Sequence, residues 1–297
     1  MSVDQENDFT LEKTRVANSF GRASGLYHSA SQLQEGVANE LFERLDLMTL
    51  VPARILDLGS GPGKAATKLV KRFRKARLIE LDISFDMLAE AKRDTPRFFS
   101  RRSKLCNDAE NLSLATSSVD LVFSNLMLQW CQDLDAAFKE IARVLKPGGL
   151  FIFSSFGPDT LVELRQSWAA VDDSVHVNAF IDMHDVGDAL MRAQLENPVL
   201  ETDLLLRSYE SAWPLMRELK TLGAHNVNSG RRRTLTGKTK FNGMLAEYEK
   251  LRQAEGLPAS YEVVYGHAWA PAAQLARRVD EMTSTYPLSA LRGSNQT

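Results

Sequence analysis

The sequence predicts an α/β fold in which a mainly parallel sheet is covered by helices on both faces. Three observations lead to this prediction. Short apolar segments alternate with amphipathic, helix-like segments between residues 54 and 154, a rhythm typical of repeated strand–helix units. A turn with three glycines follows the first apolar segment. The 297 residues are 44% hydrophobic and 25% charged, which supplies enough apolar side chain for a large core.

The strand predictions rest on short apolar runs that are bounded by turn residues. Such runs occur at 54–58, 77–81, 105–109, 120–124, 150–154, 199–208 and 260–269. The fifth run follows Pro147-Gly148-Gly149, which predicts a sharp turn directly before that strand.

The helix predictions rest on apolar residues that recur at intervals of three and four. Between residues 10 and 48, Phe20, Leu33 and Val37 belong to one such apolar face. Further helices are predicted at 63–74, 85–93, 134–144, 159–171, 184–193 and 241–254. We expect one domain over 1–297, with an N-terminal helical lid at 10–48, a sheet core at 52–208 and 259–271, and a helical, basic insertion at 209–258.

Charge and composition exclude several classes of protein. The net charge is -2 and the pI is about 6.3, so the overall charge gives no footprint for nucleic acid. No apolar run approaches the roughly 20 residues of a membrane helix, and the acidic N-terminus is not a signal peptide. The two cysteines, Cys106 and Cys131, form no disulfide or metal pattern and are expected to be buried. These features favour a cytoplasmic protein without a membrane or nucleic-acid partner.

The glycine turn has the spacing Gly59-x-Gly61-x-Gly63. A dinucleotide fingerprint requires a small residue where this chain has Lys64, and the spacing of a P-loop is also absent. The remaining pattern is an acid, Asp57, followed by glycines at alternate positions. Glycines there allow the backbone to approach a ligand closely, and the carboxylate can accept from a ligand ammonium group or orient the turn.

Further polar residues follow the later strands at the positions where open α/β sheets bind ligands. Asp82 ends the second strand and can accept from both hydroxyls of a ribose. Asp108 lies in the segment CNDAENLSL after the third strand, and Asn125 ends the fourth strand.

These signals, together with RVLKPGGLFIFS, occur in the order that is typical of class I S-adenosylmethionine-dependent methyltransferases, and the chain resembles that superfamily. The resemblance implies a Rossmann-like seven-stranded sheet with N-terminal helices and a helical insertion before the last strand. It implies S-adenosyl-L-methionine as cofactor, with Asp108 meeting the adenine amino group and Asn125 facing the methionine half. Leu126 and Trp130 are expected to pack. The implied cofactor residues are Asp57, Gly59, Ser60, Gly61, Gly63, Asp82, Ile83, Met87, Asp108, Ala109, Glu110 and Asn125.

Segments outside the core indicate a narrower family. SFGRASGLYHSASQLQ, FGPDTLVELRQSW, GAHNVNSGR and YEVVYGHAW resemble the malonyl-[acyl-carrier protein] O-methyltransferase family, over residues 14–271. The resemblance implies methylation of the free carboxylate of malonyl-acyl carrier protein, the first step of pimeloyl chain assembly in biotin synthesis. Ser60 stands where many members have cysteine, and since this position offers its backbone, little consequence is expected.

That reaction makes simple chemical demands. A malonyl carboxylate is ionised at neutral pH, so a general base is not required and positioning of the reactants supplies the catalysis. A guanidinium binds a carboxylate with two parallel hydrogen bonds. The positioning candidates are Tyr27, His176 and Arg231, and the histidines show no metal spacing.

An acidic carrier protein requires a positive docking face on an enzyme with this net charge. The basic candidates for substrate and carrier docking are Arg22, Arg231, Arg232, Arg233, Lys238 and Lys240. A second basic cluster, KLVKRFRKAR, is expected on the solvent face of the first core helix.

Three alternatives share the fold. A mitochondrial complex I assembly factor, linked to arginine hydroxylation, looks similar around FGPDTLVELR and PASYEVVY. A methyltransferase of a small quinone or phenol would not need the basic insertion. A non-catalytic protein that binds S-adenosylmethionine would keep the same glycine turn and Asp82.

Overall fold

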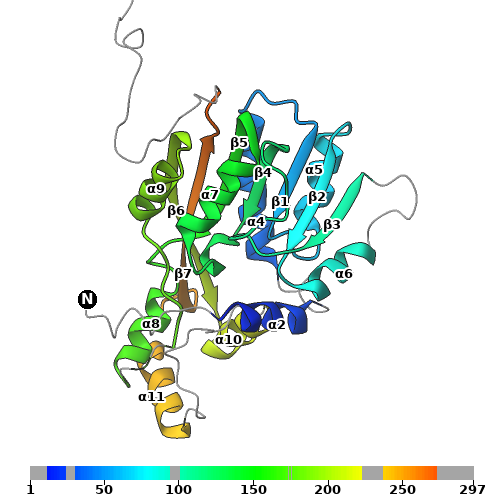
Figure 1. The fold of residues 1–297 in the computed structure, drawn as a ribbon. Helices are drawn as coiled ribbons and strands as arrows, with labels where there is room; N and C mark the ends of the chain where they lie inside the picture. The colour runs from blue at the N-terminus through cyan, green and yellow to red at the C-terminus, as the bar shows by residue number, and fades with distance from the viewer. Residues whose placement is uncertain are drawn as a thin grey trace, which may run out of the picture.

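The computed structural model describes residues 12–24, 31–93, 101–172, 174, 176–222 and 237–272. These residues form a seven-stranded sheet of order β3-β2-β1-β4-β5-β7-β6, with helices on both faces (Figure 1). The strands are β1 (Arg54–Leu58), β2 (Arg77–Asp82), β3 (Arg102–Cys106), β4 (Val119–Asn125), β5 (Leu145–Phe156), β6 (Glu196–Tyr209) and β7 (Leu257–Trp269).

The direction of the strands divides the sheet into two parts. β3, β2, β1, β4 and β5 are parallel, whereas β7 lies between β5 and β6 and is antiparallel to both. Parallel strands need a crossover through a helix, which explains the strand–helix rhythm of the first half of the chain. The predicted α/β architecture is confirmed.

The helices are α2 (Lys13–Ala23), α4 (Gln32–Asp46), α5 (Lys64–Arg72), α6 (Phe85–Arg93), α7 (Leu134–Val144), α8 (Val162–Ala169), α9 (Met183–Arg192), α10 (Ala212–Thr221) and α11 (Lys238–Glu249), with a 3-10 turn, η2 (Leu128–Trp130). One buried cluster lies between the sheet and α4, α5, α8, α10 and α11. A second lies on the other face, under α7 and α9. None of the helices in the described ranges is long and apolar enough to cross a membrane.

The third strand was predicted too late in the chain. β3 spans Arg102–Cys106 and pairs with β2, rather than lying at 105–109. Its charged side chains Arg102 and Lys104 both pair with Glu80, which is fully buried on β2. Charges that are neutralised inside the sheet hide the strand from a search for apolar runs.

The turn expected at 147–149 lies inside β5, which begins at Leu145. Gly148 has a φ of 71° and its N–H donates to the carbonyl of Ala270 at 3.1 Å. The segment therefore bends while it remains attached to the chain that follows β7.

Two helical predictions also need correction. α10 was not predicted, although Ala212 and Leu215 are buried in the core and Met216 and Leu219 pack against it. α8 begins at Val162 instead of residue 159, directly after Leu161, which has a φ of 56°. The preceding residues form turns, so the apolar periodicity began before the helix did.

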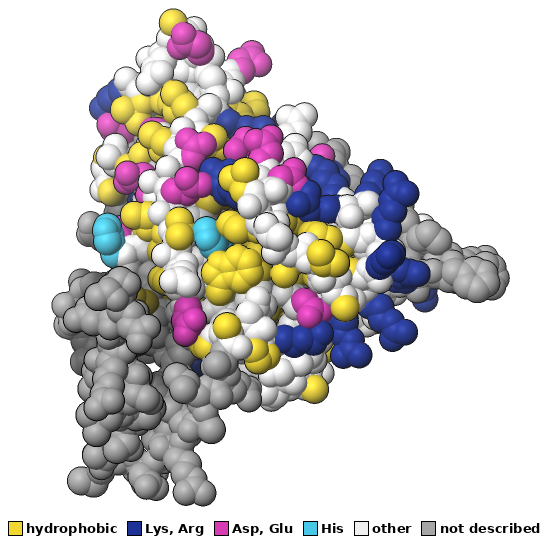
Figure 2. Space-filling view, turned by 90° about the horizontal axis from the view of Figure 1, so that it is seen from above, with side chains coloured by type: hydrophobic (Ala, Val, Ile, Leu, Met, Phe, Trp, Pro, Cys, Tyr) yellow, Lys and Arg dark blue, Asp and Glu magenta, His cyan; other side chains and the backbone are white. Residues whose placement is uncertain are grey.

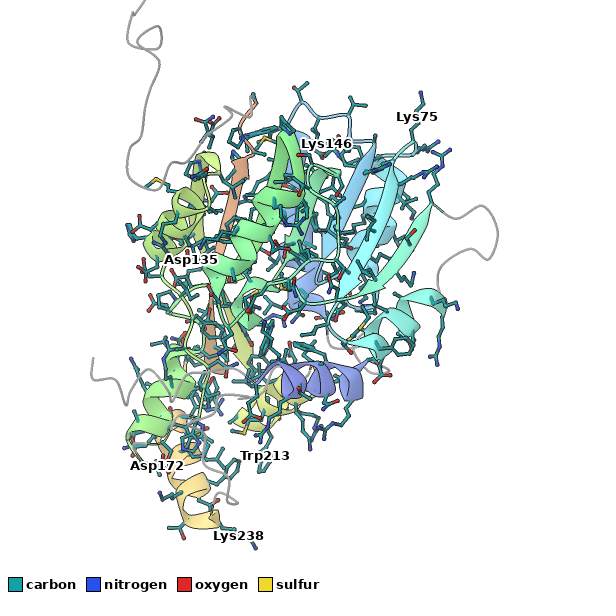
Figure 3. The ribbon with its side chains drawn as sticks, viewed as in Figure 1. Lys75, Asp135, Lys146, Asp172, Trp213 and Lys238 are labelled. Carbon is teal, nitrogen blue, oxygen red and sulfur yellow. The ribbon has the colours of Figure 1, made fainter. Side chains whose placement is uncertain are left out.

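The surface around the beginning of the parallel strands differs in charge from the surface around their end. Figure 2 looks down on the edge where these strands begin and shows Lys and Arg side chains gathered on one side of it. We call the exposed residues there the basic face; Lys75 marks it in Figure 3. The basic face consists of Arg54, Lys71, Arg74, Lys75, Arg77 and Arg101. The opposite edge, where the parallel strands end, is covered by α2 (Figure 1).

Candidate active site

A cavity lies between α2 and the ends of the parallel strands, and we call it the α2 cavity. Its walls come from α2, from the segments that follow β1, β2, β3 and β4, and from η2. The lining includes Lys13, Val16, Phe20, Gly59, Gly61, Asp82, Ile83, Met87, Asp108, Ala109, Glu110, Asn125, Trp130 and Cys131. Nine of the twelve residues that were predicted from the sequence to bind cofactor therefore line one cavity, as part of a set gathered from four strand ends.

The glycine turn holds its backbone open toward this cavity. Gly59 and Gly61 have φ values of 76° and 52°, which glycine adopts without strain. The N–H groups of Gly59 and Ser60 donate to the carbonyl of Leu81, at 2.8 and 3.0 Å. A Cβ atom at Gly61 would meet nothing within 4 Å, so the backbone there faces open space.

The third glycine of the turn has a different environment. Gly63 has a φ of 83°, and a Cβ atom on it would lie 2.7 Å from Arg102 Nη2 and 2.9 Å from Glu80 Oε2. The glycine is therefore required by the buried ion pair beneath the turn, where Arg102 Nη2 lies 2.6 Å from Glu80 Oε2. The sequence predicts a cofactor contact and a positive φ for the glycines of this turn, but it does not reveal the ion pair beneath Gly63.

Asp82 is oriented by two backbone donors. Its Oδ2 atom accepts from the N–H of Gly61 at 2.9 Å, and its Oδ1 atom accepts from the N–H of Ser84 at 2.8 Å. Burial raises the pKa of Asp82 to about 6, although both hydrogen bonds favour the charged form. The carboxylate is thus fixed in direction and is mostly ionised at neutral pH.

A second cavity, the glycine-turn groove, lies between α4 and α5. Gly59, Gly61 and Asn125 line both this groove and the α2 cavity, so the two cavities share a wall. The remaining lining includes Ser31, Gln34, Glu35, Asp57, Ser60, Pro62, Gly63, Lys64, Lys68 and Lys71.

Three polar atoms in the wall of the groove are buried without a hydrogen-bond partner among the described residues. They are Oδ2 of Asp57, Oγ of Ser60 and Oε1 of Gln34. Buried polar groups are normally paired, so this set points to a polar ligand. Burial, followed by the charge of Glu80, raises the pKa of Asp57 well above its usual value. A ligand ammonium group would favour the ionised form of that carboxyl.

Asn125, in the wall shared by the two cavities, forms hydrogen bonds to β5 and to α4. Its Oδ1 atom accepts from the hydroxyl of the buried Ser154 at 2.9 Å, and its Nδ2 atom donates to the carbonyl of Gln34 at 3.1 Å. The end of β4 is thereby tied to β5 on one side and to α4 on the other.

The loop after β3 presents two carboxylates to α2. Lys13 Nζ lies 2.6 Å from Oδ2 of Asp108 and 2.6 Å from Oε2 of Glu110. Burial lowers the pKa of Lys13, but the hydrogen bonds to the two acids outweigh it and the pKa is raised. Lys13 is not among the site residues predicted from the sequence, because a lone lysine on a helix gives no signal of its own.

Two aromatic side chains, one from α2 and one from η2, form part of the wall of the α2 cavity. The rings of Phe20 and Trp130 meet edge to face, with centroids 5.0 Å apart. Trp130, which was expected only to pack, also lines the cavity. The cysteine prediction needs correction as well: Cys131 is half-buried in the cavity wall, and Cys106 is exposed, because it ends the edge strand β3.

His176 lies away from both cavities. Its ring stacks on Trp168, with centroids 3.7 Å apart, and its Nε2 atom lies 2.7 Å from Oδ1 of Asp172. Lys240 Nζ lies 2.9 Å from the other oxygen of Asp172, so part of the positive charge of Lys240 is already offset. Figure 3 shows Asp172 next to α8 and Lys238 at α11, beyond the end of the sheet. This placement gives the positioning role predicted for His176 no support.

The other residues predicted to dock the carrier protein differ in where they lie. Arg22 is exposed on α2 and donates to the carbonyl of Asn18 at 3.3 Å. Lys238 is exposed in the first turn of α11. Tyr27, Arg231, Arg232 and Arg233 lie outside the described residues. Within the described ranges, no cluster of three His, Cys, Asp or Glu side chains is arranged to hold a metal ion.

Comparisons with known proteins agree with this geometry. Residues 56–153 match a family model described as a methyltransferase domain. A phosphoethanolamine N-methyltransferase 2 of Haemonchus contortus, solved with S-adenosylhomocysteine, aligns with a TM-score of 0.52 at 21% identity, covering 78% of this chain and 53% of that one. That likeness concerns the fold alone. The family model defines residues 56–153 as a methyltransferase domain, and the fold of the chain agrees with that class.

Two curated relatives narrow the class. A malonyl-[acyl-carrier protein] O-methyltransferase of Methylovorus sp. is 47% identical over 90% of this chain and 92% of its own length. One of Laribacter hongkongensis is 46% identical over 92% of this chain and 94% of its own length. The chain belongs to the malonyl-[acyl-carrier protein] O-methyltransferase family.

Proposed function

We propose that this protein transfers a methyl group from S-adenosylmethionine to the free carboxylate of malonyl-acyl carrier protein and forms the methyl ester. The observation that carries the proposal is the extent of the match, 47% identity over 90% of the chain. It therefore includes the segments outside residues 56–153, which the fold does not require.

The α2 cavity suits the adenosine half of the cofactor. Asp82 has two oxygens held in place by backbone donors, which suits a ribose diol. Asp108 offers an acceptor to the adenine amino group, and the apolar side chains of Ile83 and Met87 supply flat contact surface for the base. The backbone around Ala109 and Glu110 completes this end.

The glycine-turn groove suits the amino-acid half. The unpaired acceptors of Asp57 and Gln34 match an ammonium donor, and the open backbone at Gly61 admits close approach. When bound, the cofactor supplies an electrophilic sulfonium methyl group. Gly59, Gly61 and Asn125, which line both cavities, bound the space in which that methyl group would be presented.

The residues then act by position. The malonyl carboxylate is the nucleophile and is already ionised, so no side chain has to remove a proton from it. Asn125 is held on both sides by Ser154 and Gln34 and fixes the wall beside the reaction centre. Val16 and Phe20 line the α2 cavity with apolar surface and exclude water from it, which reduces the hydration that a carboxylate must lose before it attacks.

The acceptor half of the proposal rests on residues that were chosen from the sequence. Tyr27 and Arg231 are proposed to orient the malonyl carboxylate. Arg22, Arg231, Arg232, Arg233, Lys238 and Lys240 are proposed to dock the acidic carrier protein. The proposed setting is the cytoplasm, at the start of pimeloyl chain assembly for biotin, without a metal ion.

Mass spectrometry of malonyl-acyl carrier protein tests the function directly. After incubation with this protein and S-adenosylmethionine, we expect a mass gain of one methyl group that an esterase removes. Acetyl-acyl carrier protein, which has no free carboxylate, is the matched control and should gain nothing. An unchanged malonyl substrate, under conditions where the protein binds S-adenosylhomocysteine, would reject this acceptor.

A further inference from the structure

We infer that Lys13 is a positioning residue that latches α2 across the adenine end of the α2 cavity. The inference rests on the proposed function only in its choice of cofactor; the identity of the methyl acceptor does not enter it. It assigns a role to a residue that lies outside the glycine turn and outside every segment that binds cofactor through a strand end.

The loop after β3 carries two carboxylates, those of Asp108 and Glu110, in positions where both can bind one cation. Oδ1 of Asp108 accepts from the N–H of Glu110 at 3.0 Å, and Oε1 of Glu110 accepts from the N–H of Gln132 at 2.7 Å. Each carboxylate thus has one oxygen fixed by the backbone, and its second oxygen lies 2.6 Å from the ammonium group of Lys13. Two acceptors that are already fixed lose little freedom when they bind, which strengthens the contact.

The same contact occupies an oxygen that the adenine amino group needs. An ammonium group and an amino group are both donors, and Oδ2 of Asp108 faces Lys13 inside the cavity. Glu110 gives Lys13 a second anchor, so the lysine can share or release Asp108 to the base while it keeps α2 attached. The latch therefore closes over a bound cofactor rather than competing with it outright.

The rest of α2 explains why its first turn depends on this contact. At the other end of the helix, Gly21 packs so closely on α6 that a Cβ atom would lie 2.6 Å from Oδ2 of Asp86. Directly before Gly21, the ring of Phe20 contacts Trp130. At the first turn, Lys13 supplies the hydrogen bonds to the loop. When Lys13 is truncated, that end of the lid can lift while the other end stays packed.

Arg15 provides a matched control on the same helix. It also carries a positive charge near the first turn, but its ion pair at 2.5 Å is with Glu12, three residues earlier in the chain. Lys13→Met and Arg15→Met each remove one charge from α2, and the Lys13 change alone removes a contact to the loop.

The experiment measures release of S-adenosylhomocysteine by stopped-flow dilution, with Trp130 in the cavity wall as a fluorescence reporter. We expect Lys13→Met to speed dissociation about fivefold, as for loss of a partly buried ion pair. Lys13→Arg should restore the rate to within about twofold, and Arg15→Met should leave it unchanged. In a double-mutant cycle, Glu110→Gln should add little to Lys13→Met.

A second readout needs no cofactor. Hydrogen exchange of the first-turn amides of α2 should speed up in the free Lys13→Met protein and stay unchanged in Arg15→Met. Equal dissociation rates for Lys13→Met and wild type, or equal effects of the two variants, would overturn the latch. Neither measurement includes an acceptor, so a failure to methylate malonyl-acyl carrier protein would reject the proposed function and leave these results interpretable.

Discussion

Asp82 shows how a single side chain can make the site sensitive to pH. Its pKa is raised to about 6 by burial, while the N–H groups of Gly61 and Ser84 hold its two oxygens. Burial raises the pKa values of Asp57 and Cys106, and the charge of Asp82 raises them further. A carboxylate with a raised pKa is ionised above that value and protonated below it.

We therefore expect cofactor affinity to fall as the pH drops through about 6. The ionised form accepts from both ribose hydroxyls, so the Kd of S-adenosylhomocysteine should rise about tenfold per pH unit below pH 6 and level off above pH 7. Calorimetric titration between pH 5 and pH 8 measures this change. Asp82→Asn should bind weakly with little pH dependence, whereas a flat wild-type profile would show that ionisation of Asp82 does not control binding.

Gly61 and Gly63 share a left-handed backbone but differ in what lies beside them. Gly63→Ala forces a Cβ atom against the buried pair of Glu80 and Arg102 and should lower the free energy of unfolding by ~2–3 kcal/mol. Gly61→Ala meets no atom within 4 Å and should cost about 1 kcal/mol, from backbone strain alone. Urea unfolding compares the two variants.

The same pair of variants separates stability from binding. Gly61→Ala adds a methyl group toward the cavities and should weaken S-adenosylhomocysteine binding more than Gly63→Ala does in the fraction that stays folded. The opposite ranking, in stability or in affinity, would contradict the division of roles within the glycine turn.

At the scale of elements, the sequence predicts regular strand–helix units well and irregular pairing poorly. β1, α6 and α7 have the predicted bounds because their apolar periodicity is uninterrupted. β3 was misplaced because its charges are paired with Glu80 on a neighbouring strand, a contact that no local pattern reveals. The strand-end residues Asp82, Asp108 and Asn125 were found because topology alone brings strand ends together.

The part of the cavity wall that α2 supplies, which we call the roof, could not be predicted from the sequence for a related reason. Lys13, Val16 and Phe20 read as an ordinary amphipathic helix, and their role depends on where α2 docks. Their contacts connect α2 to residues more than ninety positions later, such as Lys13 with Asp108. A helix face can be predicted from its period, but its partner in the fold cannot.

The apolar part of this roof can be tested apart from Lys13. Phe20→Ala removes the edge-to-face contact with Trp130 and opens the cavity to water, so the Kd of S-adenosylhomocysteine should rise about tenfold. Phe20→Leu keeps most of the apolar bulk and should lose less. Calorimetry gives the affinities, and thermal unfolding monitors stability. An unchanged affinity in Phe20→Ala would show that α2 covers the cavity without contributing to binding.

For the molecule as a whole, charge is distributed unevenly despite a net charge of -2. The basic face lies at the edge where the parallel strands begin (Figure 2), opposite the α2 cavity. The basic segment that sequence analysis selected for docking, Arg231 to Arg233, lies outside the described residues. Two basic regions therefore compete for the role of carrier dock, and their positions in the chain allow them to be changed independently.

Charge reversal distinguishes the two regions. Changing Arg231, Arg232 and Arg233 to glutamate should raise the KM for malonyl-acyl carrier protein at least about tenfold and reduce its dependence on salt, because rim charges steer association. Changing Arg74, Lys75 and Arg77 to glutamate alters the same amount of charge on the basic face and should leave KM within about twofold. Steady-state kinetics at several salt concentrations measures both. A large effect of the second set alone would move the dock to the basic face.

The position of β7 has a consequence for the order in which this protein takes shape. β7 fills the space between β5 and β6, yet it comes last of the seven strands along the chain. A nascent chain that has released β6 from the ribosome therefore has strand edges on β5 and β6 that still lack their shared neighbour. Until Leu257–Trp269 has been synthesised, α10 and α11 lie next to an incomplete sheet. Unpaired strand edges of this kind can pair with other chains and lead to aggregation. Because β7 joins β5 to β6, the sheet can be completed only late in synthesis.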